Sequence, residues 1–229
     1  DIIKMNKLSA ALVMLSEGVP FFQAGEEILR SKPNADGSYN HNSYNSPDTV
    51  NSIKWSSLED EAVQGVYDYY QGLIAFRKAH PVLRLAVASD VNQHVTTLRG
   101  LGANVVGFDI DGSIEGEHAD RMYILYNANA SSTTVDLPEG DWNVYVKGKQ
   151  AGVKCLETVS GTVTVEGISA MVLVQEPFII DVTDDTTDDA NTSSVNPIVL
   201  PIVVGVVAVV AIAAVSAVII IKKRKEAGL

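Results

Sequence analysis

The stretch "RMYILYNANASSTTVDLPEGDWNVYV", residues 121–146, holds three short runs rich in β-branched and aromatic residues. Turn-forming residues separate the runs, among them Pro138 and Gly140 in "DLPEGDW". Short runs of this kind, divided by regular turn signals, are typical of the antiparallel strands of a β-sandwich. The stretch therefore predicts an all-β unit.

Further strand-like runs flank this stretch and define the extent of the all-β unit. They are "HVTTLRG", "NVVGFDID", "GTVTVEG" and "SAMVLVQ". In the third run, Val163 and Val165 alternate with Thr162 and Thr164, which is the pattern of a half-buried strand. We therefore predict an antiparallel β-sandwich over residues 81–178.

The N-terminal residues 1–80 have the pattern of an α/β unit. Apolar residues recur at helical spacing in residues 2–17 and 58–79, and residues 19–23 are a short, mostly apolar run. A strand that is apolar on both faces and follows a helix fits an α/β barrel. We predict that residues 1–80 are the C-terminal part of a (β/α)8 barrel. One such strand cannot close a sheet alone, so we expect further sequence upstream of Asp1.

The C-terminal residues predict a membrane anchor. The run from Ile198 to Ile221 carries no charge and is long enough, as a helix, to cross a bilayer. The basic tail, residues 222–229, then indicates the cytoplasmic side. Before the run, the acidic, Thr- and Ser-rich residues 179–197 predict a flexible stalk. We expect a single transmembrane helix, a body on the extracellular face and a Gram-positive source.

Charge and composition limit the ligands. The chain has a formal net charge of −11, with four basic residues in its tail. A body this acidic repels phosphate backbones, so we expect no nucleic-acid partner, whereas neutral ligands such as sugars are compatible with it. One cysteine, Cys155, and four scattered histidines give no metal-ligand spacing. We therefore expect no metal and no cofactor.

The long polar loop that follows the predicted strand, residues 24–51, is the candidate site. It carries Arg30, Tyr39, Tyr44, Asp48 and Asn51, whose charged, aromatic and amide groups are of the kinds that bind sugars. Barrel enzymes place their chemistry on such loops, although composition alone also fits a solvated, turn-rich loop.

Two adjacent carboxylates, Glu26 and Glu27, begin this loop. Neighbouring residues on an extended strand point to opposite faces, so this pair is not expected to flank one glycosidic bond.

Four stretches together resemble type I pullulanases, the α-glucan debranching enzymes of glycoside hydrolase family 13. They are "KMNKLSAALVMLSEGVPFFQAGEEILRSK", "NSYNSPDTVNSIKW", "LIAFRKAHPVLR" and "ILYNANASSTTVDLPEGDWNVYV", and the resemblance covers about residues 1–176. It implies retaining hydrolysis of α-1,6 branch links in pullulan, starch or glycogen. The family's catalytic residues lie on earlier barrel strands. The resemblance therefore implies no catalytic residue in this chain, which alone should be inactive.

The resemblance also assigns roles within the loop. Glu27 aligns with a Glu that supports the wall of the active site. Asp48 is the best candidate for holding sugar hydroxyls, and Arg30, Tyr44 and Asn51 are further candidates for substrate contact. Two departures affect these contacts: Pro47 stands where the family often has Gly, and the insert "PNADGSYNH" lengthens the loop.

Two alternatives remain open at this point. One is a surface-anchored α-glucan-binding module without catalysis, against which the barrel-like pattern of residues 1–55 argues. The other is a different family 13 enzyme, isoamylase-like or amylase-like, against which the motif "NSYNSPD" argues.

Overall fold

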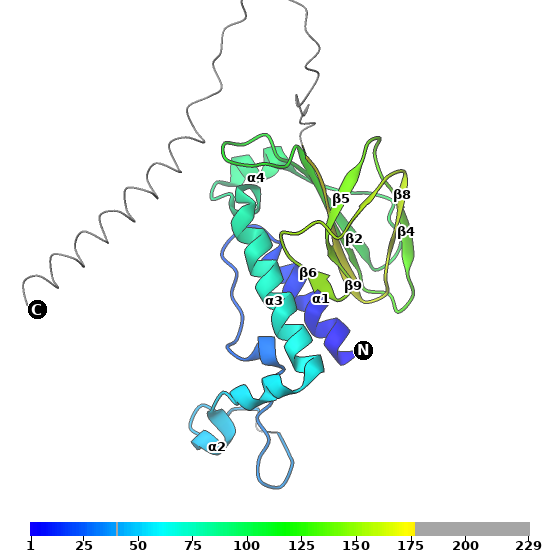
Figure 1. The fold of residues 1–229 in the computed structure, drawn as a ribbon. Helices are drawn as coiled ribbons and strands as arrows, with labels where there is room; N and C mark the ends of the chain where they lie inside the picture. The colour runs from blue at the N-terminus through cyan, green and yellow to red at the C-terminus, as the bar shows by residue number, and fades with distance from the viewer. Residues whose placement is uncertain (40, 177–229) are drawn as a thin grey trace, which may run out of the picture. The chain divides into compact units, whose positions relative to one another are not determined.

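A seven-stranded antiparallel sheet organises the part of the chain that the computed structural model describes, residues 1–39 and 41–176. Its strand order is β1-β2-β3-β9-β5-β6, and β7 also pairs with β5. A second sheet of two strands, β4 and β8, packs on one face, and helices α1 (Ile2–Met14) and α3 (Glu61–Ala79) cover the other (Figure 1). The strands are β1 (Val95–Thr97), β2 (Val105–Asp111), β3 (Arg121–Asn127), β4 (Thr133–Asp136), β5 (Trp142–Lys147), β6 (Gln150–Ala151), β7 (Glu157–Val159), β8 (Thr162–Val165) and β9 (Ser169–Gln175).

Strands β3 and β9 form the centre of the large sheet and are buried on both faces. Residues of the two strands pair in register, so that Met122 lies opposite Val174 and Tyr123 opposite Leu173. Successive side chains of a strand point to opposite faces. Met122 and Val174 therefore face the helices, whereas Tyr123 and Leu173 face the small sheet.

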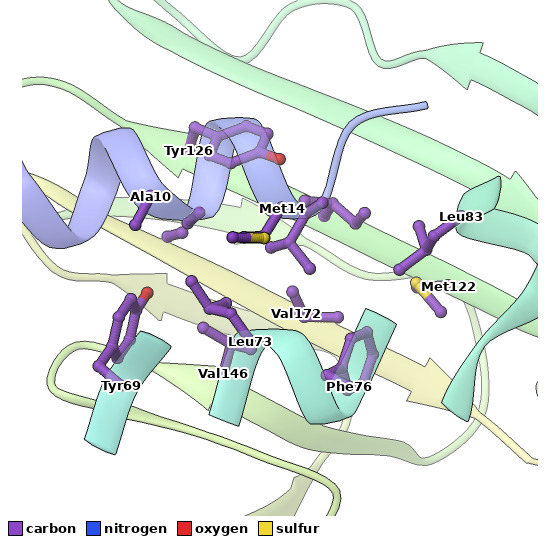
Figure 2. Packing of buried hydrophobic residues seen from close by; sticks show 14 of the residues in the cluster. Ala10, Met14, Tyr69, Leu73, Phe76, Leu83, Met122, Tyr126, Val146 and Val172 are labelled. Carbon is purple, nitrogen blue, oxygen red and sulfur yellow. The ribbon is translucent and has the colours of Figure 1, made fainter. Parts of the chain in front are cut away.

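The two hydrophobic cores lie on the two faces of this sheet. Between the sheets, Trp142 is fully buried and packs against Tyr123 with 4.8 Å between ring centroids. On the helical face, Met14 of α1 and Leu73 and Phe76 of α3 pack on the sheet around Val172 (Figure 2).

The helices are α1 (Ile2–Met14), α2 (Asp48–Asn51), α3 (Glu61–Ala79) and α4 (Ala88–His94), and the short 3-10 segments are η1 (Glu26–Ile28), η2 (Trp55–Glu59) and η3 (Pro81–Arg84). Helix α3 begins where the Asp60 carboxylate accepts a hydrogen bond from the Ala62 amide, at 2.8 Å. It ends at His80, because the residue before a proline is disfavoured in a helix.

The predicted barrel part is wrong. Residues 19–23 form no strand but an irregular segment in which Val19 is 94% and Phe21 90% exposed. A strand needs backbone partners on a neighbouring strand, and within the described residues none lies beside this segment. Helices α1 and α3 instead pack against the antiparallel sheet, so the described fold is a β-sandwich-like unit with a helical layer.

The transmembrane part of the predicted fold class is not supported either. Across residues 1–39 and 41–176, no helix is long and apolar enough to span a membrane. The predicted span, residues 198–221, lies outside the described residues, as do the predicted tail and the predicted stalk. The antiparallel β part of the prediction agrees with the structure.

Candidate functional site

Arg30 ties together the two ends of the loop formed by residues 24–51. Its guanidinium donates one hydrogen bond to the Ala24 carbonyl at 3.1 Å and another to the Asn51 carbonyl. Gly25 makes this possible, because its φ of 100° suits glycine and a Cβ there would come within 2.5 Å of the Arg30 side chain. Arg30 thus shapes the loop.

Asn51 holds the second half of the loop from inside. Its side-chain amide donates to the carbonyls of Ser43, at 2.6 Å, and Ser46, at 2.9 Å. These two bonds bracket Tyr44 and fix the turn that leads into α2. Because its amide nitrogen donates to these two backbone carbonyls, Asn51 fixes the shape of the loop in this structure.

Tyr44 and Asp48, by contrast, face solvent. Tyr44 is 86% exposed, and Asp48 is the exposed first residue of α2. Among the described residues no hydrogen-bond partner of the Asp48 carboxylate is found, so its oxygens are available to a ligand's hydroxyl groups. The structure therefore brings together the four predicted residues of one loop and separates them into two that shape it and two that face outward.

Two further aromatic rings are exposed near the loop, of which the sequence singled out Tyr39 but not Trp55. Tyr39, at 73%, and Trp55, at 56%, are both exposed, and Trp55 begins η2 soon after Asp48. An exposed aromatic ring offers a large apolar face that can stack on a sugar ring, and the Tyr hydroxyl or Trp N–H can also form a hydrogen bond. The sequence carries these residues in "GSY" and "IKW", but no pattern in it distinguishes an exposed ring from a buried one.

The adjacent carboxylates serve the turn at the start of the loop. Glu26 accepts a hydrogen bond from the Gln23 amide at 3.0 Å, and Glu27 accepts one from the Gly25 amide at 2.8 Å. Both residues lie in the 3-10 segment η1. The prediction that Glu26 and Glu27 lie on a strand is therefore wrong. Each carboxylate instead accepts a hydrogen bond from a backbone amide of the same turn.

A metal centre is not found in the described part of the chain. Nowhere in residues 1–39 or 41–176 do three or more His, Cys, Asp or Glu side chains come together in a way that could hold a metal ion.

Comparisons with known proteins find similarity to pullulanases and isoamylases. Residues 91–150 match the family described as "Pullulanase, all-beta domain". The chain is 30% identical to a pullulanase of Bacillus subtilis over 133 residues, which are 58% of this chain and 17% of that protein. It is 34% identical to an isoamylase of a Flavobacterium species over 154 residues, or 59% of this chain and 19% of that protein.

Solved structures give the same result. The pullulanase from Bacillus acidopullulyticus superposes with a TM-score of 0.69 and 38% identity, covering 76% of this chain and 20% of that one. A pullulanase from Anoxybacillus, solved as a complex with maltotriose, superposes with a TM-score of 0.61 and 29% identity, covering 76% of this chain and 23% of that one.

The chain thus spans about a fifth of the length of the relatives it matches. Over the part that is covered, the family match, the sequence identities and the structural superpositions all point to pullulanases. The resemblance to type I pullulanases is therefore confirmed, and residues 91–150 match the all-beta domain of pullulanases.

Proposed function

We propose that this chain is the C-terminal part of a glycoside hydrolase that cleaves α-1,6 branch links in pullulan, starch or glycogen. The observation that carries the proposal is the structural similarity to pullulanases over 76% of the chain at 38% identity. The similar enzyme solved with maltotriose supports an α-glucan as the substrate class.

The catalytic carboxylates of the proposed enzyme lie outside these 229 residues. Glycoside hydrolysis needs two carboxyl groups that face each other across the scissile bond. Glu26 and Glu27, which are next to each other in the candidate loop, are both bonded to backbone amides. We expect the chain alone to release no sugar from an α-glucan, and Glu27 to support the active-site wall by holding the turn at Gly25.

The loop would contribute substrate contacts. Asp48 would accept hydrogen bonds from sugar hydroxyls, and the ring of Tyr44 would cover a sugar face. Trp55 is a further candidate for stacking because 56% of its surface is exposed. Arg30 and Asn51 would act on the substrate through the shape of the loop, since their polar groups are bonded to its backbone.

The proposal is tested by measuring the reducing sugar released from pullulan by two proteins. One is the 229-residue chain, and the other is the product of the whole reading frame that encodes it. We expect no release by the first and sustained release by the second. Hydrolysis by the 229-residue chain would refute the placement of the catalytic groups, and an inactive full product would refute the enzyme assignment.

An isoamylase-like enzyme is the second candidate, because the chain is 34% identical to an isoamylase. Rates on pullulan and on glycogen, measured side by side with the full product, separate the two. A binding module without catalysis would retain maltotetraose but hydrolyse neither polymer. The cell-surface location stays a prediction that rests on residues outside the described part of the chain.

A further inference from the structure

A cavity of about 790 Å³ lies between α1, the first half of α3 and the turn that joins β5 to β6. This volume falls in the range of small-molecule sites, about 300–1,000 Å³. Four lysines line it: Lys4 and Lys7 of α1, and Lys149 and Lys154 of the turn region.

The lysines are concentrated at this cavity although the chain is acidic. Residues 1–176 contain eight lysines, and half of them line this one cavity, while the chain as a whole has a net charge of −11. Three carboxylates, Glu61, Asp68 and Glu166, also face it. Amines therefore outnumber carboxylates here, which reverses the balance of the rest of the molecule.

Lys7 is the central group of this cluster. It is only 6% exposed, its amine donates to the Lys149 carbonyl at 3.2 Å, and it lies 5.1 Å from the centroid of the Tyr69 ring. Within the described residues it forms no ion pair. Burial, and next the neighbouring Lys149 charge, lower the pKa of Lys7, while Asp68 acts weakly in the opposite direction.

A buried ammonium without a counter-ion is costly, because burial removes water, and one carbonyl and the Tyr69 ring replace only part of the lost stabilisation. One carbonyl satisfies one of the three donors of an ammonium. The cavity beside Lys7 is the place where an anion would supply the missing charge and accept the remaining hydrogen bonds.

The rest of the cavity wall favours an apolar body and argues against a sugar. Ile3, Val153 and Ile168 line it, and the Tyr69 ring is 1% exposed, so it offers no face for stacking on a sugar ring. Gly65 in the middle of α3 leaves open space, with no atom within 4 Å of the place of a Cβ. No close contact requires a glycine there.

We propose that this cavity binds a small monocarboxylate with an apolar body, whose carboxylate lies between Lys7 and Lys149 and whose body lies along Ile3 and Ile168. The site is separate from the loop of residues 24–51. The proposal does not depend on the glucanase assignment.

The test is isothermal titration of the full 229-residue chain with decanoate. Decanol, which has a similar body without the charge, and inorganic phosphate, which has charge without the body, are the comparison probes. We expect decanoate to bind at least about tenfold more tightly than either. Equal binding of decanoate and decanol, or no binding of decanoate at millimolar concentration, would overturn the proposal.

Variants assign the binding to this cavity. Lys149→Met keeps the backbone carbonyl that holds Lys7 and removes one charge, so it reports on the site even if Lys7→Met fails to fold. We expect each variant to weaken decanoate binding by about tenfold. Lys78→Met, which changes an exposed lysine of α3 outside the cavity, is the matched control. Unchanged affinity in Lys149→Met would contradict the proposed position of the carboxylate.

Discussion

Glu117 connects the end of α3 to the loop between β2 and β3, and its removal should destabilise the fold strongly. Its side chain is fully buried and accepts a hydrogen bond from the His80 ring at 2.7 Å. It also accepts hydrogen bonds from three backbone amides, those of Val82, His118 and Ala119, at 3.1, 2.9 and 3.0 Å. One carboxylate therefore serves four donors.

The magnitude follows from the donors that Glu117→Ala would leave without an acceptor. The amides of Val82 and Ala119 belong to buried residues, and each buried group left unsatisfied costs about 1–3 kcal/mol. The His80 ring loses a charge-assisted bond as well. We expect a loss of about 3–5 kcal/mol in the free energy of unfolding, the sum of these unsatisfied hydrogen bonds.

The assay is urea denaturation followed by circular dichroism, with Glu115→Ala as the matched control because Glu115 is exposed in the same loop. The control should change stability by less than about 0.5 kcal/mol. If Glu117→Ala were no less stable than Glu115→Ala, the reasoning from buried, unsatisfied donors would be refuted.

The pH dependence has a definite sign. Burial raises the pKa of Glu117, but the hydrogen bonds from His80, Ala119 and Val82 outweigh it, so the pKa lies below its usual value. A carboxylate with a lowered pKa in the folded state contributes stability above its unfolded pKa, about 4.3. That contribution is lost as the pH falls through the folded pKa, so the difference between wild type and Glu117→Ala should be full at neutral pH and shrink below about pH 4.

Four further substitutions test the packing and the loop. Asp60→Ala removes the N-cap of α3 and should cost about 1 kcal/mol in urea denaturation. Gly72→Ala should cost about 1–3 kcal/mol, because its Cβ would come within 2.0 Å of the Ala151 carbonyl oxygen, whereas Gly65→Ala, which meets open space, should stabilise by up to about 1 kcal/mol. Equal effects of the two glycine variants would contradict the described contact between α3 and β6. Asn51→Ala should speed amide hydrogen exchange in residues 41–51 without lowering global stability, and unchanged exchange there would refute its role in shaping the loop.

The sheet was predictable from the sequence because its strands carry local signals. The alternation of Val163 and Val165 with threonines and the turn at Pro138 are readable without tertiary context. The two-residue strand β6 and the register shift between Val144 and Val146 are not, because they depend on which strands meet.

The barrel strand at residues 19–23 was mispredicted because the hydrophobic periodicity of so short an apolar run does not show whether it forms a strand, or with which strand it would pair. Residues 19–23 read equally well as a buried strand or as an apolar segment. Phe22 packs against Tyr70, at 5.9 Å between ring centroids, while Phe21 is exposed. The apolar residues that the sequence offered to a barrel strand are thus divided between the helical core and the surface.

The candidate loop could be located from its composition, but the roles of its residues could not be assigned in that way. Arg30 and Asn51 looked like ligand-binding groups because they are polar, and the structure bonds both to the backbone of the loop. Asp48 and Tyr44 face solvent, as contacts with a substrate require. Only the three-dimensional hydrogen-bond pattern separates the two kinds.

The most direct test of the account is the kcat/KM for pullulan of the full reading-frame product with Asp48→Ala, compared with Asp36→Ala. Both aspartates are exposed on the same loop, but Asp36 bonds to Ser38 at its tip. We expect Asp48→Ala to lower kcat/KM by at least about tenfold, the value of one lost hydrogen bond to a charged group, and Asp36→Ala to leave it unchanged. Equal activity of the two variants and wild type, or no hydrolysis of pullulan by the wild type, would contradict it.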